Sequence, residues 1–375
     1  MEIELKESAT QDFKKIIILD IANNHFGDIN HGKEIIKTFS NLKYPKGYKI
    51  YFKLQFRNLD TFIHNKAPKD SHYIKRFNST KLNKKDLLDL SKSIKNLRNS
   101  RFGLMITPFD EDSVSWALEA NTDLLKVASC SANDWPLLSK IVRSNIPCVA
   151  STGGLKVKDI DNLVSFLRHK GTDFALMHCI SVYPTKVEDC NINFINELKK
   201  RYGDLSIGWS THEPPENNDI IISALSVGAQ LLERHICLPS KSMPKNAYSS
   251  NPNELQKWLD KIEITNKLLD CSKIKNREEE RNSIDLLARG AYARRNIKKG
   301  EIINDDDFYF AFPILDEGQH TASTIKIGSK VLKDIKKDQS LIEDENICSP
   351  PINSEFYLKE GLHEVKAMLA KAKIK

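Results

Sequence analysis

Short apolar runs alternate with helical stretches along most of the chain, and this alternation limits the possible folds more than any other feature. The eight runs lie at 16–21, 49–54, 103–106, 124–128, 147–150, 174–178, 205–209 and 229–232. Between them, 159–169 repeats apolar residues at the spacing of one helical face, and 139–143 and 193–200 do the same. Continuous apolar strands that alternate with helices indicate a parallel sheet with both faces buried.

Eight strand–helix repeats are the content of a closed (β/α)8 TIM barrel, which needs roughly 250 residues. An open, doubly wound sheet is the alternative. The first predicted strand, however, is not followed by the Gly-x-Gly-x-x-Gly turn that is typical of dinucleotide-binding sheets of that kind. We therefore predict an α/β barrel domain over 1–264.

The character of the chain changes near residue 286. The segments 289–303 and 326–342 read as short strands joined by turns. We expect a small β-rich domain at 286–348, which would be marginally stable alone because so short a chain buries little apolar surface. A charged linker at 265–285 would join it to the barrel, and a basic, helical tail would occupy 349–375.

The overall composition excludes some classes of protein. The net charge of +7 arises from 57 basic and 50 acidic residues that are scattered along the chain, without the basic stripe of a nucleic-acid module. No apolar run approaches the roughly 20 residues that a membrane helix needs. Because the first residues are charged and lack an apolar core, we expect no signal peptide. The seven cysteines form no Cys-x-x-Cys pair. They indicate free core thiols and a cytoplasmic location.

Polar side chains close almost every predicted strand. Because the carboxyl ends of parallel barrel strands open on one face, these side chains should gather there. They are, in chain order, Asp20, Asn24, Lys53, Gln55, Thr107, Lys126, Ser129, Ser151, Ser181, Tyr183, Ser210, His212 and His235.

Two lysines within apolar strands suggest an anionic substrate. A buried ammonium group is costly unless an anion is nearby, so Lys53 and Lys126 either pair with a structural carboxylate such as Asp20 or hold a substrate that carries carboxylate and phosphate groups. The Ser-Thr-Gly-Gly segment at 151–154 offers hydroxyls and backbone amides for a phosphate, although the same residues also suit a plain strand-to-helix turn.

Two histidines at the ends of successive strands suggest a metal site. Neutral imidazoles of His212 and His235 suit Mn²⁺, Fe²⁺, Co²⁺ or Zn²⁺, with water or substrate completing the shell. The alternative is that both are hydrogen-bonded core histidines. For His25 and His178 the two interpretations stay open, and Tyr183 is either a substrate contact or a packing residue at the barrel rim.

Short motifs in collinear order resemble the sialic acid synthase family. They are Asn-x-His-x-Gly at 23–27, Lys-x-Gln at 53–55, Thr-Pro-Phe at 107–109, Lys-x-x-Ser at 126–129, Ser-Thr-Gly at 151–153, His-Cys-x-Ser-x-Tyr-Pro at 178–184, Gly-x-Ser-x-His at 208–212 and Leu-Glu-Arg-His at 232–235. The later segments at 289–293 and 297–301 look like the antifreeze-like (SAF, β-clip) domain of that family.

The resemblance implies a metal-dependent condensation of phosphoenolpyruvate with an open-chain N-acylated aldose. The products would be a 2-keto-3-deoxy sugar acid for surface glycans, such as a capsule, and phosphate. By matching position, the phosphoenolpyruvate ligands would be Lys53, Gln55, Thr107, Lys126, Ser129, Ser151, Ser181 and Ser210. The catalytic residues would be Asp20, Lys53, Lys126, Tyr183, His212 and His235.

The resemblance also implies a cofactor and a partner. His212 and His235 would hold a divalent ion, with Mn²⁺ preferred and Mg²⁺, Co²⁺, Fe²⁺ or Zn²⁺ as alternatives. The chain would form a homodimer in which the SAF domain of one subunit covers the barrel of the other. The acceptor sugar would contact Asp20, Asn24, Ser131, Tyr183 and Asn246.

Several positions depart from the family pattern, mostly on the acceptor side. The family usually has a longer glutamate where this chain has Asp20. It usually has acidic residues at Ser131, at Thr211 and at or near Asn246, and an arginine at about Phe312. We therefore expect an acceptor other than N-acetylmannosamine. Two other functions remain open, namely a related barrel aldolase or lyase that releases no phosphate, and a sugar-phosphate-binding homologue without catalysis.

Overall fold

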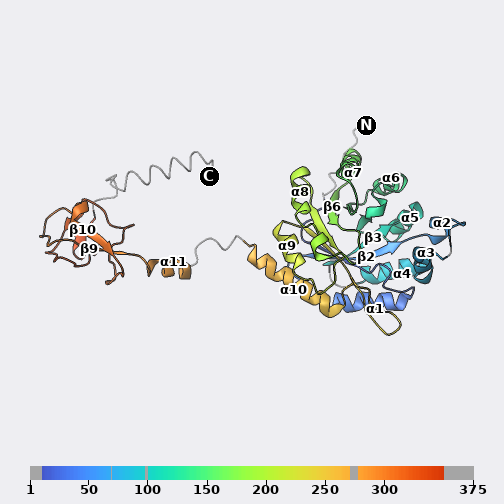
Figure 1. Ribbon diagram of the computed structural model, residues 1–375, viewed down its shortest axis with the longest axis horizontal. Helices are drawn as coiled ribbons and strands as arrows, with labels where there is room; N and C mark the ends of the chain where they lie inside the picture. Colours follow the sequence, from blue (N-terminus) through green and yellow to red (C-terminus); the bar gives the residue numbers. More distant parts are fainter. Residues whose placement is uncertain (1–10, 69, 98–99, 271–277, 350–375) are drawn as a thin grey trace. The chain divides into compact units, whose positions relative to one another are not determined.

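The computed structural model describes residues 11–68, 70–97, 100–270 and 278–349. The chain divides into two compact units, Met1–Asp270 and Cys271–Lys375. In Figure 1 the first unit is a central set of strands surrounded by helices, and the second consists mainly of short strands and loops.

The first unit is a closed barrel of eight parallel strands in sequence order. They are β1 (Ile16–Asp20), β2 (Lys49–Phe56), β3 (Phe102–Pro108), β4 (Leu124–Val127), β5 (Cys148–Ser151), β6 (Phe174–Cys179), β7 (Ile207–Thr211) and β8 (Leu231–His235). The barrel closes where β1 pairs with β8, with Asp20 beside His235. The predicted (β/α)8 barrel is confirmed, and the open-sheet alternative is wrong.

One major helix follows each strand and covers the outside of the barrel (Figure 1). These helices are α1 (Ile29–Ser40), α4 (Lys84–Lys95), α5 (Glu111–Glu119), α6 (Trp135–Arg143), α7 (Val157–His169), α8 (Phe194–Arg201), α9 (Ile220–Ser226) and α10 (Pro252–Leu268). Local signals fix their starts: Asp28 caps α1, and Asn251 forms a reciprocal capping box with Glu254 at the start of α10. Two further helices, α2 (Leu59–Phe62) and α3 (His72–Ser79), are inserted between β2 and α4.

Side-chain alternation divides each strand between two cores. One set of side chains packs outward against the helices. The other set fills the barrel interior with Phe13, Ile16, Ile18, Tyr51, Met105, Leu124, Val149, Ala175, Met177 and Leu231. Two residues further along the strands, the interior positions become polar, as at Asp20, Lys53 and Lys126. The apolar layer therefore closes one end of the barrel, and the polar layer opens at the other.

The second unit has a small core of its own. It contains α11 (Glu278–Asp285), the antiparallel pair β9 (Gly290–Ala293) and β10 (Phe308–Ala311), and the pair β11 (Lys330–Val331) and β12 (Ile347–Cys348). Its core residues are Ala291, Ala293, Ile297, Ile303, Phe308, Val331, Ile335, Leu341 and Ile347. The segment expected as a linker thus includes the end of α10 and all of α11. Apart from Ser349, the expected tail lies outside the described residues.

Two sequence expectations concern thiols and membranes. The thiols of Cys148, Cys179, Cys190 and Cys237 are free and buried, as expected for core residues, whereas Cys130 and Cys348 are exposed. Among the described residues, the structure contains no helix with the length and apolar character to cross a bilayer.

Candidate active site

A cavity of about 630 Å³ lies at the carboxyl ends of the strands. Because interior positions recur at every second residue, the strands deliver their polar ends to this one space. The predicted site residues that line it are Asp20, Lys53, Gln55, Thr107, Lys126, Ser129, Ser151, Ser181, Tyr183, Ser210, His212 and His235.

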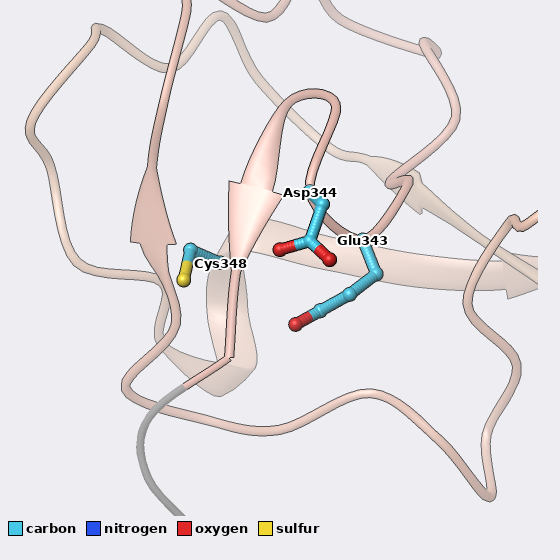
Figure 2. Close-up of side chains that lie close together, drawn as sticks. All are labelled: Glu343, Asp344 and Cys348. Carbon is cyan, nitrogen blue, oxygen red and sulfur yellow. The ribbon is translucent and has the colours of Figure 1, made fainter.

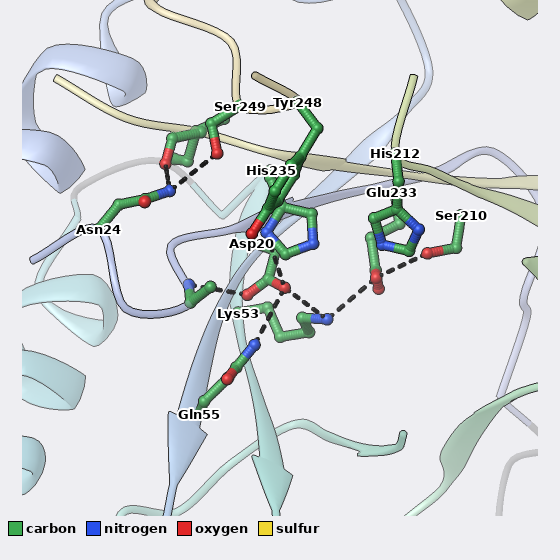
Figure 3. Close-up of polar contacts among 12 residues, drawn as sticks. Asp20, Asn24, Lys53, Gln55, Ser210, His212, Glu233, His235, Tyr248 and Ser249 are labelled. Carbon is green, nitrogen blue, oxygen red and sulfur yellow. Dashed lines mark hydrogen bonds and ion pairs between the residues drawn. The ribbon is translucent and has the colours of Figure 1, made fainter. Parts of the chain in front are cut away.

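The two buried lysines share carboxylates inside this cavity. Lys53 Nζ lies 3.0 Å from Asp20 Oδ2 and 3.0 Å from Glu233 Oε1. Lys126 Nζ lies 2.7 Å from Glu233 Oε2, and Ser210 Oγ donates to Glu233 Oε1 at 2.9 Å. Figure 3 shows part of this group. We call Asp20, Lys53, Lys126, Ser210 and Glu233 the lysine cluster. The lysines therefore pair with structural carboxylates and also line the cavity.

Mutual pairing decides the charges of the lysine cluster. Burial acts to raise the pKa of Glu233, but Lys126 and Lys53 outweigh it and hold the pKa below its usual range. Burial acts to lower the pKa of Lys53, but Asp20 and Glu233 outweigh it and raise the pKa. For Lys126, burial dominates and, with the nearby Lys53, lowers the pKa. Glu233 is thus an anion held between two amines, which makes it the centre of the cluster.

Glu233 was not singled out from the sequence, although a usable signal was present. It lies two residues before His235 on β8, and two residues after Leu231, which packs in the barrel interior. Strand alternation therefore requires all three side chains to point inward. The sequence could therefore have predicted Glu233, as well as Asp20, as a partner for the buried lysines.

The two strand-end histidines lie side by side, with ring centroids 5.2 Å apart. His212 Nδ1 lies 2.8 Å from the carbonyl oxygen of Ile180, so this nitrogen carries a proton and Nε2 keeps its lone pair. His235 Nδ1 is buried without a hydrogen-bond partner among the described residues and lies 3.4 Å from Asp20 Oδ2.

Both imidazoles are held neutral. Burial, helped by the neighbouring His235, lowers the pKa of His212 to about 3, and burial also lowers the pKa of His235. Neutral rings with free lone pairs, one oriented by a backbone carbonyl, fit the requirements of a divalent metal ion.

Further hydroxyl groups line the same cavity. A Cβ atom at Gly153 would lie 2.4 Å from Ser181 Oγ and 2.9 Å from Ser129 Oγ, so only glycine lets these hydroxyls approach the turn after β5. Gly153 N donates to Ser129 Oγ at 3.0 Å. Thr107 Oγ1 is buried without a partner among the described residues. These groups are available to an oxyanion such as phosphate.

Three predicted acceptor contacts do not line the cavity. Asn24 Nδ2 donates to Ile236 O at 2.8 Å and to Ser249 Oγ at 3.0 Å, and Figure 3 shows the bond to Ser249. Asn246 Nδ2 donates to Asn24 Oδ1 at 3.2 Å. The two asparagines thus tie together the loops after β1 and β8, and Ser131 is buried in the turn after β4.

His25 and His178 also lie outside the cavity lining. His25 Nδ1 accepts from Gly27 N at 3.1 Å, and His178 Nε2 lies 3.1 Å from Cys190 O. Both are hydrogen-bonded core histidines, which answers the question that the sequence left open. Tyr183 does line the cavity, and its ring lies 4.3 Å from the ring of His212.

Part of the cavity wall comes from residues that the sequence did not indicate. These residues are Arg57, His72, Tyr73, Arg76, Phe77 and Tyr248. All but Tyr248 lie between β2 and α4, where the chain inserts α3. Whether these residues reach the cavity depends on how the inserted segment folds over the barrel, and the periodicity of the strands does not determine this.

Another group of possible metal ligands lies in the second unit. Oxygen and sulfur atoms of Glu343, Asp344 and Cys348 come within 4.8 Å of one another (Figure 2). Glu343 is already engaged, because its carboxylate accepts from Ser349 Oγ at 2.7 Å and lies 2.7 Å from His320 Nε2. We assign this group to holding the local turn.

Known proteins share this fold and sequence. The sequence model of the NeuB family matches residues 50–274. The uncharacterised protein MJ1065 of Methanocaldococcus jannaschii is 31% identical over 331 residues, covering 87% of this chain and 92% of that protein. The N,N'-diacetyllegionaminic acid synthase of Campylobacter jejuni is 26% identical, covering 78% and 88%.

A crystal structure gives the same result. A Chromobacterium violaceum structure, described as a candidate spore coat polysaccharide biosynthesis protein E, superimposes with a TM-score of 0.80 at 36% identity. The match covers 89% of this chain and 100% of that one. Together with the family match, this likeness confirms the resemblance drawn from the strand-end motifs: the chain belongs to the NeuB family.

Proposed function

We propose that this chain condenses phosphoenolpyruvate with an open-chain aldose to give a 2-keto-3-deoxy sugar acid and phosphate. The relatives include a synthase of a sialic-acid-like sugar acid, which supports a role of this general kind. The observation that carries the proposal is one cavity that holds two buried lysines, a set of convergent hydroxyls and a pair of neutral imidazoles.

Each part of the cavity has a task in this reaction. Lys53 and Lys126 would bind the donor's anionic groups, together with the hydroxyls of Thr107, Ser129, Ser151, Ser181 and Ser210. His212 and His235 would hold a divalent ion, preferably Mn²⁺, which when bound supplies Lewis-acid polarisation of the aldehyde. Both lysines, both histidines and the hydroxyls of Thr107, Ser151 and Ser210 are buried, whereas Ser129 is partly exposed and Ser181 is exposed.

The chemistry proceeds in two bond-forming steps. The methylene carbon of phosphoenolpyruvate forms a bond to the aldehyde carbon, and the aldehyde oxygen takes up a proton. Water then adds at C2 of the donor, and phosphate leaves with cleavage of its C–O bond. Glu233, shared between Lys53 and Lys126, keeps both ammonium groups oriented while the substrate charges change.

The test is release of inorganic phosphate from phosphoenolpyruvate with Mn²⁺ and a panel of aldoses, with the product mass measured alongside. We expect release with a particular sugar and a product mass equal to that sugar plus pyruvate. Lys126→Met should abolish release, whereas Lys158→Met, which removes an exposed lysine on α7, should not.

Two results would favour the competing functions. Formation of the sugar acid from pyruvate without phosphate release would identify an aldolase. Binding of phosphoenolpyruvate without turnover of any aldose would favour a non-catalytic homologue.

We further propose that the second unit is an antifreeze-like SAF domain and that the chain acts as a cytoplasmic homodimer. The β-rich character of 286–348 and its Lys-Lys-Gly-Glu turn support this assignment. The molar mass in solution, measured by light scattering, tests the dimer. Deleting 286–375 should then lower turnover while leaving phosphoenolpyruvate binding in place.

A further inference from the structure

Two arginines line the cavity outside the lysine cluster. Arg57 follows β2, and Arg76 lies on α3. Within the lysine cluster, two lysines and two carboxylates cancel each other's formal charge. Neither arginine forms an ion pair with any residue that the structure describes. The uncompensated positive charge of the cavity therefore lies on this side.

The two carboxylates that act electrostatically on Arg57, namely Asp20 and Asp110, are committed elsewhere. Asp20 accepts from Ala22 N at 2.9 Å and pairs with Lys53. Asp110 caps α5 by accepting from Ser113 N at 2.8 Å, and it also accepts from Asn58 N at 2.8 Å. Neither carboxylate is thus free to neutralise a guanidinium.

Arg57 is held ready for a ligand. Its guanidinium carbon lies 3.5 Å from the ring centroid of Phe109 and 4.6 Å from that of Phe77. Its Nη2 donates to Gln55 Oε1 at 3.1 Å, and its Nε is buried without a partner among the described residues. Stacking between two rings fixes the plane of the guanidinium, so little rotamer entropy remains to be lost on binding.

The charge of Arg57 is poorly compensated. Burial, with a contribution from the nearby Arg76, lowers the pKa of Arg57 to about 10, so the side chain stays protonated at neutral pH. A half-buried cation beside a second cation is unfavourable unless an anion approaches both. We call Arg57, Arg76, Phe77 and Phe109 the arginine wall.

We propose that the arginine wall binds an anionic group, a phosphate or a carboxylate, at the end of the acceptor sugar remote from its aldehyde. The inference rests on the proposed function, in which the aldehyde meets the histidine pair. Arg57 contacts Gln55, which donates to Asp20 at 3.3 Å, and Asp20 lies beside His235. Gln55, which the resemblance assigned to the donor, has both ends of its amide engaged by Asp20 and Arg57, so it links the wall to Asp20, an expected acceptor contact. Lysines and hydroxyls serve the donor.

The test uses three sugars that differ only at C6. N-Acetylmannosamine, its 6-phosphate and the corresponding uronate are titrated calorimetrically into the Mn²⁺-loaded protein without phosphoenolpyruvate, so that no reaction can occur. We expect at least one of the anionic sugars to bind about tenfold or more tightly than the neutral sugar, as charge-assisted hydrogen bonds to a guanidinium require. The tighter anion identifies the group.

Two variants test whether Arg57 causes the tighter binding of the anionic sugar. Arg57→Met, which keeps an apolar side chain between the two rings, should remove the advantage of the anionic sugar while changing the affinity for the neutral sugar by less than about twofold. Arg143→Gln removes an exposed charge on α6 and should change nothing. Equal binding of the three sugars would overturn the inference, as would an Arg57→Met variant that keeps the full preference.

A separate titration with phosphoenolpyruvate distinguishes this inference from the proposed function. Loss of donor binding in Arg57→Met would show that the wall serves the donor and would overturn the inference. A wild-type protein that does not bind phosphoenolpyruvate would contradict the proposed function, while the C6 series would still decide whether the wall binds an anion.

Discussion

The lysine cluster and the arginine wall line the same cavity and treat charge in opposite ways. In the lysine cluster, Lys53 and Lys126 have carboxylate partners within 3.0 Å. In the arginine wall, Arg57 has stacked rings and one amide oxygen instead. The lysines that barrel strands place in the cavity are thus paired with carboxylates of the protein. The two arginines between β2 and α4 remain available to a ligand.

The difference follows from burial and backbone support. Lys126 is 2% exposed and its partner Glu233 is 3% exposed, so either charge alone would be severely destabilising. The wall is only half-buried, and both of its arginines lie between β2 and α4, in a segment that the barrel does not need for closure. We infer that the cluster supplies the shared chemistry of the reaction and that the wall selects the acceptor.

The largest expected effect concerns the histidine pair beside the lysine cluster. His235→Ala should remove a metal ligand and lower turnover on the order of 10³-fold, since metal polarisation contributes several kcal/mol. It should also weaken Mn²⁺ binding measured by calorimetry. His169→Ala, an exposed histidine at the end of α7, serves as the control. Unchanged turnover in His235→Ala would refute the metal assignment.

The next largest effect is on stability and tests the pairing within the lysine cluster. Glu233→Gln keeps the side-chain shape but leaves Lys126 and much of Lys53 uncompensated. We expect it to lower the free energy of unfolding by about 3 kcal/mol or more. Urea denaturation measures the change, with Glu119→Gln, from an exposed pair with Lys84, as the control. A loss below about 1 kcal/mol would show that the lysines do not depend on Glu233.

A pH-dependent effect, small at neutral pH and growing as the pH falls, is expected at His25, a buried neutral group outside both regions. Burial, with a smaller contribution from His31, lowers its pKa to about 4. Because the unfolded chain binds a proton there below about pH 6.5 and the folded chain does not, stability falls by up to about 1.4 kcal/mol per unit as the pH drops from about 6.5 towards about 4.

His25→Asn removes this proton uptake. The unfolding free energy of the wild type, relative to the variant, should therefore decline across the same pH range in urea titrations. A difference between the two proteins that does not vary with pH would contradict the assignment of His25 as a buried neutral histidine.

The smallest expected effect is on stability and concerns the arginine wall. Arg57→Met removes a charge that has no ionic partner in the described structure, so it leaves no carboxylate stranded. We expect the free energy of unfolding to change by less than about 1 kcal/mol, in contrast to Glu233→Gln. A loss as large as that of Glu233→Gln would mean that the wall, like the cluster, is a structural element.

The barrel and most of its polar rim were predictable for a single physical reason. Apolar runs at regular spacing fix the strands, and parallel strands bring their carboxyl ends together. Lys53, Lys126, His212 and His235 were found in this way. Glu233 was missed because the strand-end pattern indicates only the final residue of β8, although strand alternation already requires the Glu233 side chain to face inward.

Other parts of the site depend on tertiary details that the pattern does not contain. Asn24 and Asn246 have the right residue types for sugar contacts, but they bond each other across two loops. Arg57 lies beyond the end of β2, and its place in the cavity depends on how α3 packs. For the second unit, the sequence indicated short strands but not how its core is formed.

Titrating phosphoenolpyruvate into the wild type, Lys126→Met and Arg57→Met tests whether the lysine cluster binds the donor and the arginine wall does not. We predict that Lys126→Met weakens binding on the order of 10- to 100-fold, the scale of one charged hydrogen bond, while Arg57→Met changes it by less than about twofold. The reverse pattern, with donor binding lost in Arg57→Met and kept in Lys126→Met, would contradict the division between a donor cluster and an acceptor wall.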